Sequence, residues 1–302
     1  MIDKLEILLA LAREKHFGRA AESLGVTQQT LSAGLKHLED RLGVRLVERG
    51  SRFQGLTPEG ERVLDWARRI VADSRAMLEE IATLKRGLSG HLRMAVIPTA
   101  LPKVVELTTS YSERHPEVRF TIESATSENI LRLIDDLEVD AGLTYLDNEP
   151  LGRMISVPLY RERYLFLTMR GGSYDARRSI TWAEAGDARL CLLTPNMQNR
   201  RIIDQQLHAA DERPTPLIES NSTIVLLSHV QSGHYATIIP DYFVDSLGMG
   251  DRILSIPIVE PEISHQVGLV VAQREPMTPM VTSLVAHARG LSGEVPVMRV
   301  VG

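Results

Sequence analysis

The chain is poor in the residues and motifs that mark enzymes, metalloproteins and secreted proteins. Among its 302 residues there is one cysteine, Cys191, so no disulfide can form within the chain. Because it lies in the apolar run RLCLL, we expect it to pack in a core. Histidine and cysteine show no metal-site spacing, and no GxSxG, P-loop, HExxH or strand-following GxGxxG motif is present. We therefore expect no metal, no cofactor and no catalytic residues.

Long apolar runs are missing as well. No stretch approaches the roughly 18 apolar residues of a membrane-spanning helix, and LEILLALA near the start is too short and too closely flanked by acids for a signal peptide. The composition, 43% hydrophobic and 24% charged, is typical of a globular chain, and the length exceeds that of one ordinary domain. We expect a cytoplasmic protein of at least two domains without a membrane partner.

Residues 20–39, AAESLGVTQQTLSAGLKHLE, hold two helical patterns with only a short interruption between them. Gly25 suits the left-handed backbone that ends a helix, and Thr27 is placed to cap the next one. In the second helix, apolar residues recur at helical spacing and predict one buried face. These residues are Leu31, Leu35, Leu38 and Leu42. The pattern predicts a helix-turn-helix, in which the second helix reads DNA in the major groove.

The opposite face of that second helix is polar. It carries side chains that both donate and accept hydrogen bonds, which is the chemistry that reads base edges. These side chains are Gln28, Gln29, Thr30 and Ser32. The alternative is an ordinary buried two-helix corner with a polar outer face.

Residues 44–60, VRLVERGSRFQGLTPEG, run from a β-prone segment through a turn to a second short strand and a helix start at Thr57-Pro58. This order predicts a hairpin wing beside the recognition helix. Arg45, Arg49 and Arg52 lie on or near the wing, where they can meet phosphates. Taken singly, each arginine is more commonly a solvated surface charge.

With these segments the chain resembles the LysR-type transcriptional regulators, a bacterial family, over its whole length. The matching residues are HFGRAAESLGVTQQTLS, KHLEDRLGVRL, Arg49 and LTPEG, followed by a long helix and an effector domain. The chain has Gln29 where the family usually has Pro or Ser, Val47 for the usual Phe, and Ala33 and Gly34 where polar or basic groups are common. Glycine inside a helix costs about 1 kcal/mol relative to alanine. Gly34 therefore either admits a close backbone approach or weakens that turn.

The resemblance implies a sequence-specific regulator that binds double-stranded promoter DNA as a homodimer or homotetramer, and it allows RNA polymerase as a further partner. The candidate DNA contacts are Arg19, Thr27, Gln28, Gln29, Thr30, Ser32, Lys36, Arg49 and Arg52.

Positive charge is scarce for a DNA-binding protein, since the net charge is −5. Residues 1–58 nevertheless hold nine Lys and Arg against seven Asp and Glu, a balance of +2, whereas residues 90–302 hold nineteen against twenty-six, a balance of −7. Affinity for DNA comes largely from neutralised phosphates, so one copy with this small excess should bind weakly. We therefore expect a multimer.

Residues 59–87 supply a means of pairing, because apolar residues alternate spacings of four and three in a heptad seam. The seam comprises Val63, Ala67, Ile70, Ser74, Met77, Ile81 and Leu84, flanked by Leu64, Val71 and Leu78. We expect a linker helix that pairs two chains. The alternative is an amphipathic helix that lies on its own domain.

From Gly90 onward strand patterns alternate with helix patterns, which predicts an α/β fold with mostly parallel strands. The resemblance implies two lobes, similar to the periplasmic binding-protein fold, with hinges near 161–164 and 264–267. The expected division is a winged helix-turn-helix domain at 1–58, a linker dimerisation helix at 59–88, and an effector domain at 90–302. Lobe I comprises 90–162 and 266–302, and lobe II comprises 163–265.

Ligands of such folds bind between the lobes, beyond the carboxyl ends of strands. Helix N-termini there attract anions, so we expect a small organic acid as the effector. The candidate residues are Pro98, Thr99, Ala100, Thr126, Ser127, Thr144, Met197, Gln198, Asn199 and Ser222. Helix capping is the alternative role for each hydroxyl or amide. Arg200 and Arg201 either close on the anion or lie on the helix surface.

A solute-binding protein without a DNA function remains the alternative that the C-terminal two thirds alone would allow. The predicted winged helix-turn-helix domain at 1–58, which we call the reader, counts against it, and so does the missing signal peptide.

Overall fold

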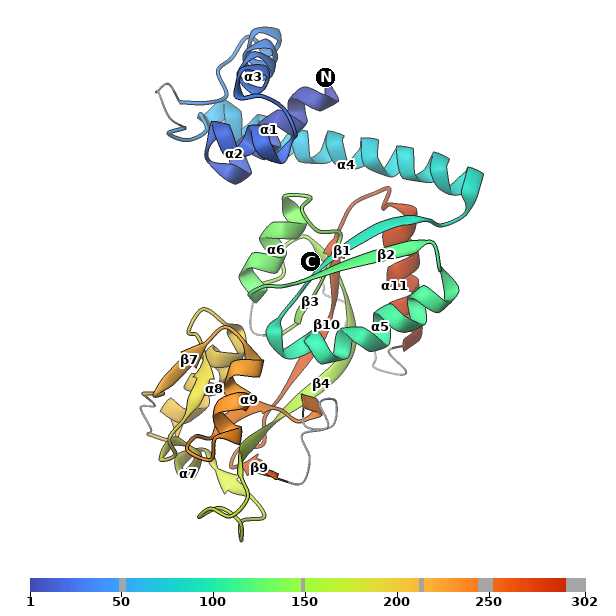
Figure 1. Ribbon diagram of the computed structural model, residues 1–302. Coiled ribbons are helices and arrows are strands. Elements are labelled where there is room, and N and C mark those ends of the chain that lie inside the picture. Colours follow the sequence, from blue (N-terminus) through green and yellow to red (C-terminus); the bar gives the residue numbers. More distant parts are fainter. Residues whose placement is uncertain (49–52, 148–149, 212–214, 244–251, 292–302) are drawn as a thin grey trace.

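The computed structural model describes residues 1–48, 53–147, 150–211, 215–243 and 252–291. A small helical domain at the N-terminus leads into one long helix, which passes over the first of two α/β lobes, and the second lobe lies beyond it (Figure 1). Among these residues no helix is long and apolar enough to cross a membrane.

The N-terminal domain packs three helices, α1 (Ile2–Glu14), α2 (Phe17–Ser23) and α3 (Gln28–Leu42). Its core includes Leu8, Leu11, Leu31 and Leu38, none of which has any exposed surface. Between α2 and α3 the chain turns at Gly25, whose φ of 65° lies in the left-handed region that glycine adopts readily. A bridge between Val47 and Leu56 closes the base of the wing.

Gly34 lies where α3 faces α1. A Cβ atom at this position would overlap Cδ1 of Ile7, the far end of a flexible side chain, so a larger residue would require Ile7 to change its conformation. The contact at Gly34 is thus with a side chain of α1 and not with its backbone.

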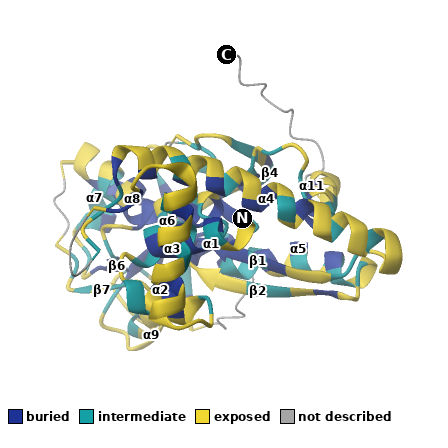
Figure 2. Cartoon of the chain, turned by 90° about the horizontal axis from the view of Figure 1, so that it is seen from above, coloured by how far each residue is buried: buried dark blue, intermediate teal, exposed yellow. Residues whose placement is uncertain are grey.

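Helix α4 (Pro58–Arg86) begins at Thr57, whose hydroxyl accepts the Gly60 N–H at 3.0 Å. One face of the helix is buried against α1 and the first lobe, with Leu64, Ala67 and Val71 at most 4% exposed. Its outer face remains apolar and exposed, at Trp66, Ile70, Met77, Leu78, Ile81 and Leu84. We call these six residues the outer stripe. Figure 2 shows α4 from above, with much of its second half exposed.

Lobe I is built on β1 (Gly90–Val96), β2 (Val118–Ser124), β3 (Ala141–Tyr145) and β10 (Ser264–Ala272). It also contains the short 3-10 helix η1 (Pro98–Ala100) and the helices α5 (Leu101–Arg114), α6 (Ser127–Asp135) and α11 (Pro279–Leu291). The pairs β1–β2 and β1–β3 are parallel, but β10 is antiparallel to both β3 and β4.

Strand β4 (Met154–Met169) joins the lobes. It pairs with β10 as far as Arg163 and with β8 (Thr237–Pro240) from Tyr164 onward. The rest of lobe II comprises β5 (Ile180–Thr181), α7 (Trp182–Gly186), β6 (Cys191–Leu193), α8 (Gln198–Ala209), β7 (Ile218–Ser220), α9 (Thr223–Gln231) and β9 (Ile253–Val259). The expectation of mostly parallel strands is therefore wrong for β4 and β10, which lie antiparallel to their neighbours. These two strands connect the lobes directly, whereas parallel neighbours are joined through a crossover helix.

Candidate functional site

The polar face of α3 is presented to solvent. Gln28, Gln29, Ser32 and Lys36 are all exposed, while the leucines on the other side of the helix are buried in the domain core. Figure 2 shows this division along α3. The face is therefore available to a groove of DNA without any rearrangement of the domain.

Thr27 and Thr30 act together at the start of α3. The Thr27 hydroxyl accepts the Thr30 N–H at 3.2 Å, so Thr27 caps the helix, and the two hydroxyl oxygens lie 2.9 Å apart. Arg19 donates to the Glu14 carbonyl at 2.6 Å and keeps a 62% exposed side chain. Arg49 and Arg52 lie outside the described residues.

The candidate effector residues divide by burial. Thr126 and Ser222 are partly exposed, whereas the other members are buried: Pro98, Thr99, Ala100, Ser127, Thr144, Met197, Gln198 and Asn199. Thr126 serves as a helix cap, because its hydroxyl accepts the Asn129 N–H at 3.2 Å. The N-terminus of α8 has no side-chain cap, so capping does not account for Asn199.

Five of the buried candidates carry a polar atom that is shielded from solvent and has no hydrogen-bond partner in the described residues. These atoms are Thr99 Oγ1, Ser127 Oγ, Thr144 Oγ1, Gln198 Oε1 and Asn199 Oδ1. Buried polar groups are nearly always paired, with protein, water or a ligand. A set of unpaired atoms therefore indicates a place where another molecule supplies the missing partners.

Contacts across the lobes bring several of these residues together. From α8 in lobe II, Gln198 donates to the Asp147 carbonyl at 3.2 Å, and Asn199 donates to the Tyr145 hydroxyl at 3.5 Å. Tyr242 of lobe II donates to the Thr99 carbonyl. We call this region, where η1, β3 and α8 meet, the lobe junction. Ser222 precedes α9, but its side chain does not cap that helix. Its N–H donates to Ser220 Oγ at 3.1 Å.

Sequence reasoning missed the group at the centre of the lobe junction, the carboxyl of Glu162 on β4. It has no exposed surface and accepts hydrogen bonds from Tyr145 and, at 3.1 Å, from Tyr164. Burial raises its pKa to about 8, although the tyrosine hydroxyls oppose the shift. Tyr160, Glu162 and Tyr164 alternate along one strand, so their shared face was the available signal.

Arg200 has a structural role in lobe II. Its side chain is 6% exposed and pairs with Asp204 at 2.7 Å and Glu219 at 2.6 Å, and it also donates to the Leu193 carbonyl. Its charge is thus already neutralised by two acids. Arg201 donates to the Asn196 carbonyl at 2.9 Å, next to its own helix.

Cys191 packs in the core of lobe II, as expected from its apolar surroundings. The thiol has no exposed surface, and burial raises its pKa to about 11. Within the described part of the chain, no group of three or more His, Cys, Asp and Glu residues is placed to hold a metal ion.

Two family profiles together cover most of the chain. The profile of bacterial regulatory helix-turn-helix proteins of the lysR family matches residues 2–61, and the LysR substrate-binding domain matches residues 85–292.

Individual relatives agree with the profiles. The DNA-binding transcriptional dual regulator OxyR of Escherichia coli K12 is 28% identical over 278 residues, covering 91% of this chain and 90% of that protein. A probable hydrogen peroxide-inducible genes activator of Mycobacterium xenopi is 35% identical over 177 residues, 58% of this chain and 93% of that protein. Full-length OxyR of Pseudomonas aeruginosa, solved as a cysteine-to-aspartate variant, superimposes with a TM-score of 0.74 at 26% identity over 97% of this chain and 98% of that one.

The matched proteins are transcriptional regulators, which confirms that the chain is not an enzyme. The helix-turn-helix match also excludes a solute-binding protein without a DNA function. The chain belongs to the LysR family of DNA-binding transcriptional regulators, and its C-terminal part is an effector-binding domain.

Proposed function

We propose that this regulator binds a small organic acid at the lobe junction. The bound acid changes the relative placement of the two readers of a pair of chains on promoter DNA. The observation that carries the proposal is the set of five buried, unpartnered polar atoms on η1, β3, α6 and α8. Three of them are hydroxyls, which can donate to carboxylate oxygens.

Electrostatics at the lobe junction favour an anionic ligand. Helix α8 begins there without a side-chain cap, so its first N–H groups can bind an anion. Because the pKa of Glu162 is raised to about 8, its carboxyl is mostly protonated at neutral pH and repels an anion little. A neutral carboxyl can also donate a hydrogen bond.

Peroxide sensing by a cysteine is a poor fit to this chain, although relatives are named for peroxide. The single thiol is fully buried in lobe II, and its pKa of about 11 leaves only about one molecule in ten thousand as thiolate at pH 7. The thiolate is the form that reacts with oxidants. An effector that binds reversibly accounts better for the structure.

Thr99→Val is the test of the effector proposal. Valine keeps the shape and removes the hydroxyl, so calorimetric titration with one- to six-carbon organic acids should show affinity lowered by about 1 to 3 kcal/mol. Thr109→Val, on the exposed side of α5, is the matched control and should bind like wild type. Equal affinity in wild type and Thr99→Val would move the site elsewhere, and no response to any acid would reject the carboxylate effector.

We also propose that Gln28, Gln29, Thr30 and Ser32 read bases while Arg45 and the other arginines near the wing bind phosphates. The support is the exposure of the α3 face opposite its buried leucines. This division follows the usual docking of a recognition helix.

Gln29→Ala and Thr30→Ala should each weaken binding to an operator selected from random duplexes by about 1 to 3 kcal/mol. Binding to random DNA should stay nearly unchanged, because no base-specific contact is made there. Arg45→Ala, the comparison variant, should weaken both kinds of DNA and flatten the salt dependence. The assignment fails if the Gln29 and Thr30 variants lose equal affinity for operator and random duplexes in gel shifts.

A further inference from the structure

The turn that follows α6 holds an unusual backbone conformation at the boundary between the effector domain and the reader. Leu137 has a φ of 61°, in the left-handed region that residues with a side chain rarely adopt. Its side chain packs against the hydrophobic core of the N-terminal domain, the cluster that contains Leu8 and Leu31. Such a conformation persists only where the surroundings enforce it. Backbone hydrogen bonds at the end of α6 hold this turn, since the Glu138 and Val139 N–H groups donate to the Leu133 carbonyl, and the turn directs the Leu137 side chain into the core of another domain.

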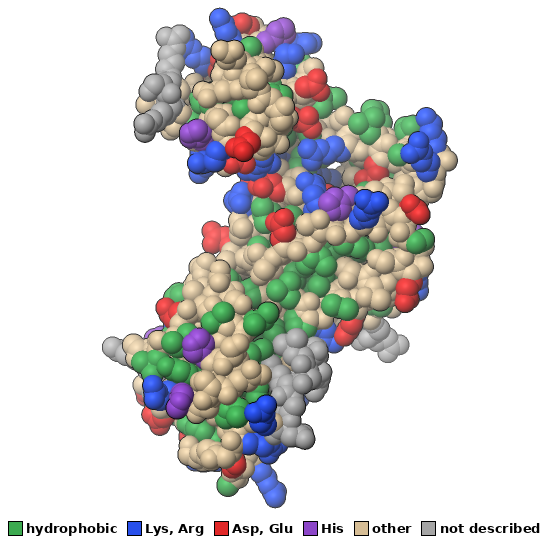
Figure 3. All heavy atoms as spheres, viewed as in Figure 1, with side chains coloured by type: hydrophobic (Ala, Val, Ile, Leu, Met, Phe, Trp, Pro, Cys, Tyr) green, Lys and Arg blue, Asp and Glu red, His purple; other side chains and the backbone are tan. Residues whose placement is uncertain are grey.

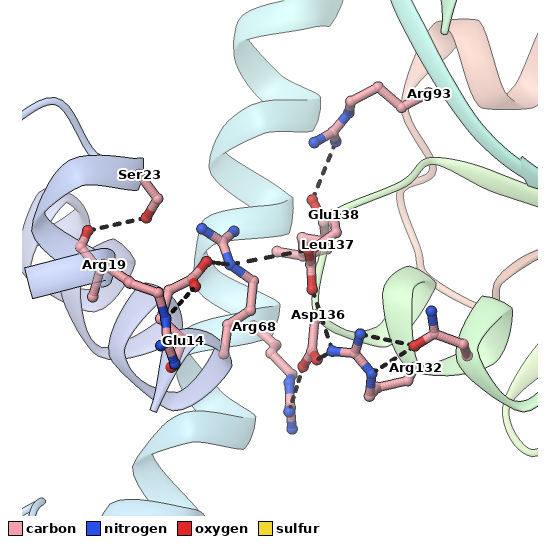
Figure 4. Close-up of polar contacts among 12 residues, drawn as sticks. Glu14, Arg19, Ser23, Arg68, Arg93, Arg132, Asp136, Leu137 and Glu138 are labelled. Atoms are coloured by element: carbon pink, nitrogen blue, oxygen red, sulfur yellow. Dashed lines mark hydrogen bonds and ion pairs between the residues drawn. The ribbon is translucent and has the colours of Figure 1, made fainter. Parts of the chain in front are cut away.

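Polar contacts fix the same turn to α4. Arg68 pairs with Asp136 at 2.7 Å, with side chains 28% and 16% exposed, and Arg75 donates to the Leu137 carbonyl at 3.3 Å. From the effector domain, Arg132 pairs with Asp136 at 3.1 Å (Figure 4). Figure 3 shows side chains of both charges gathered where the reader and α4 meet lobe I. We call residues 136–138 the docking turn.

A second contact holds α4 on lobe I at a distance from the docking turn. The Glu79 carboxylate accepts the Met280 N–H at 2.7 Å, at the first turn of α11. The reader and α4 are therefore seated on lobe I at two points. A shift of one point relative to the other would change the angle at which α4 carries the reader.

The opposite end of α6 begins beside the lobe junction, because the Ala125 N–H donates to the Val96 carbonyl at 3.0 Å, two residues before η1. Ser127 is the first residue of the helix, is 3% exposed and has a hydroxyl without a partner. Between the two ends, Ile130 and Ile134 are at most 1% exposed. Nine residues of helix span about 13 Å. Because the helix is short and firmly packed, its ends should move as one body.

We propose that α6 carries the effector signal to the reader, with Ser127 sensing the molecule at the lobe junction and the docking turn pressing on α1 and α4. This inference rests on the proposed effector site. A ligand that pairs with the Ser127 hydroxyl displaces the start of α6. The docking turn moves with the helix, and this movement changes how the reader packs on lobe I. Reciprocity then requires that a change at the docking turn be felt at Ser127.

Leu137→Gly tests the docking turn in the full-length protein. Glycine adopts the φ of 61° without strain, so the turn keeps its shape and loses only the side chain that enters the reader core. Hydrogen exchange should become about fivefold faster, or more, in α1 and the first half of α4, while β1 and β3 keep their protection. Asp211→Gly, at the end of α8 with the same φ of 61°, is the matched control and should leave α1 and α4 unchanged. Exchange in α1 and α4 that is unaltered by Leu137→Gly would overturn the proposal.

Ser127→Phe tests the other end, since the larger side chain crowds the lobe junction. Exchange in α1 and the first half of α4 should change, whereas Ser228→Phe on the exposed face of α9 should leave it unaltered. An effect of Leu137→Gly without an effect of Ser127→Phe would show a local contact without transmission and would overturn the proposal. Neither measurement uses a ligand. If organic acids fail to bind, the proposed effector is rejected, but the exchange measurements still test the role of α6.

Discussion

Replacement of Glu162 by glutamine is expected to remove a loss of stability that the wild-type protein undergoes as the pH rises from 5 to 8. Glu162 has no exposed surface, and burial raises its pKa to about 8 from a reference of 4.5. The groups that face it are hydroxyls of Tyr145, Tyr164 and Tyr242, with Asp241 adding a repulsive charge. The tyrosine hydroxyls oppose the shift, but the cost of removing the carboxyl from water is the larger effect.

The sign follows from the direction of the shift. Between pH 4.5 and about 8 the folded protein holds a proton on Glu162 that the unfolded chain has released. The stabilising contribution is therefore complete below pH 4.5 and declines until the folded carboxyl ionises near pH 8. Each unit of pH lowers the free energy of unfolding by roughly 1.4 kcal/mol, or by about 5 kcal/mol over the whole interval.

Urea unfolding of wild type and Glu162→Gln at pH 5, 6, 7, 8 and 9 measures this directly. The difference in unfolding free energy between the two proteins should change steadily up to about pH 8 and then level off, because other titrating groups contribute equally to both. A difference that stays constant across the series would mean that Glu162 is ionised in the folded protein at neutral pH, and the picture of a neutral lobe junction would be wrong.

The reader was predictable because its signals are local. The cap at Thr27 and the left-handed turn at Gly25 are set by neighbours within a few positions. Gly34 shows where local reasoning stops. The atom that a side chain at position 34 would meet is Cδ1 of Ile7, which belongs to another helix, so the sequence could offer only two alternatives.

Long-range contacts limited the prediction of the lobe junction. Glu162 takes its partners from β3 and from the segment after β8, seventeen and eighty positions away in sequence. The apolar run YLFLTMR predicts a strand from Tyr164 onward, but nothing comparable marks the first half of β4. Its first half contains Pro158 and is held by β10, more than one hundred positions later, so neither composition nor alternation identified it.

Helix α4 combines both interpretations that the sequence allowed, because one face lies on its own chain and another remains free. The buried face carries Leu64, Ala67 and Val71, so part of the expected seam is used within the chain. Among the described residues the outer stripe has no partner, with Leu84 78% exposed and Met77 57% exposed. We propose that a second copy of the chain covers the outer stripe, since large apolar side chains in a row mark an interaction surface.

The double variant Met77→Glu with Ile81→Glu is expected to separate the two copies and to abolish tight operator binding. Each glutamate would place a charge in a seam from which water is removed, and unpaired burial of a charge is strongly unfavourable. Light scattering should then give the mass of one chain. Operator affinity should fall about a hundredfold or more, because a second reader held nearby raises affinity by a factor of about 100 to 10,000.

Ala82→Glu supplies the control, since it adds the same charge to an exposed position of α4 outside the outer stripe. Its mass and operator affinity should equal those of wild type. A double variant that keeps both the mass and the affinity of wild type would place the subunit contact elsewhere. A double variant that becomes a single chain yet keeps full affinity would mean that one reader suffices, which the small positive excess of residues 1–58 makes hard to explain.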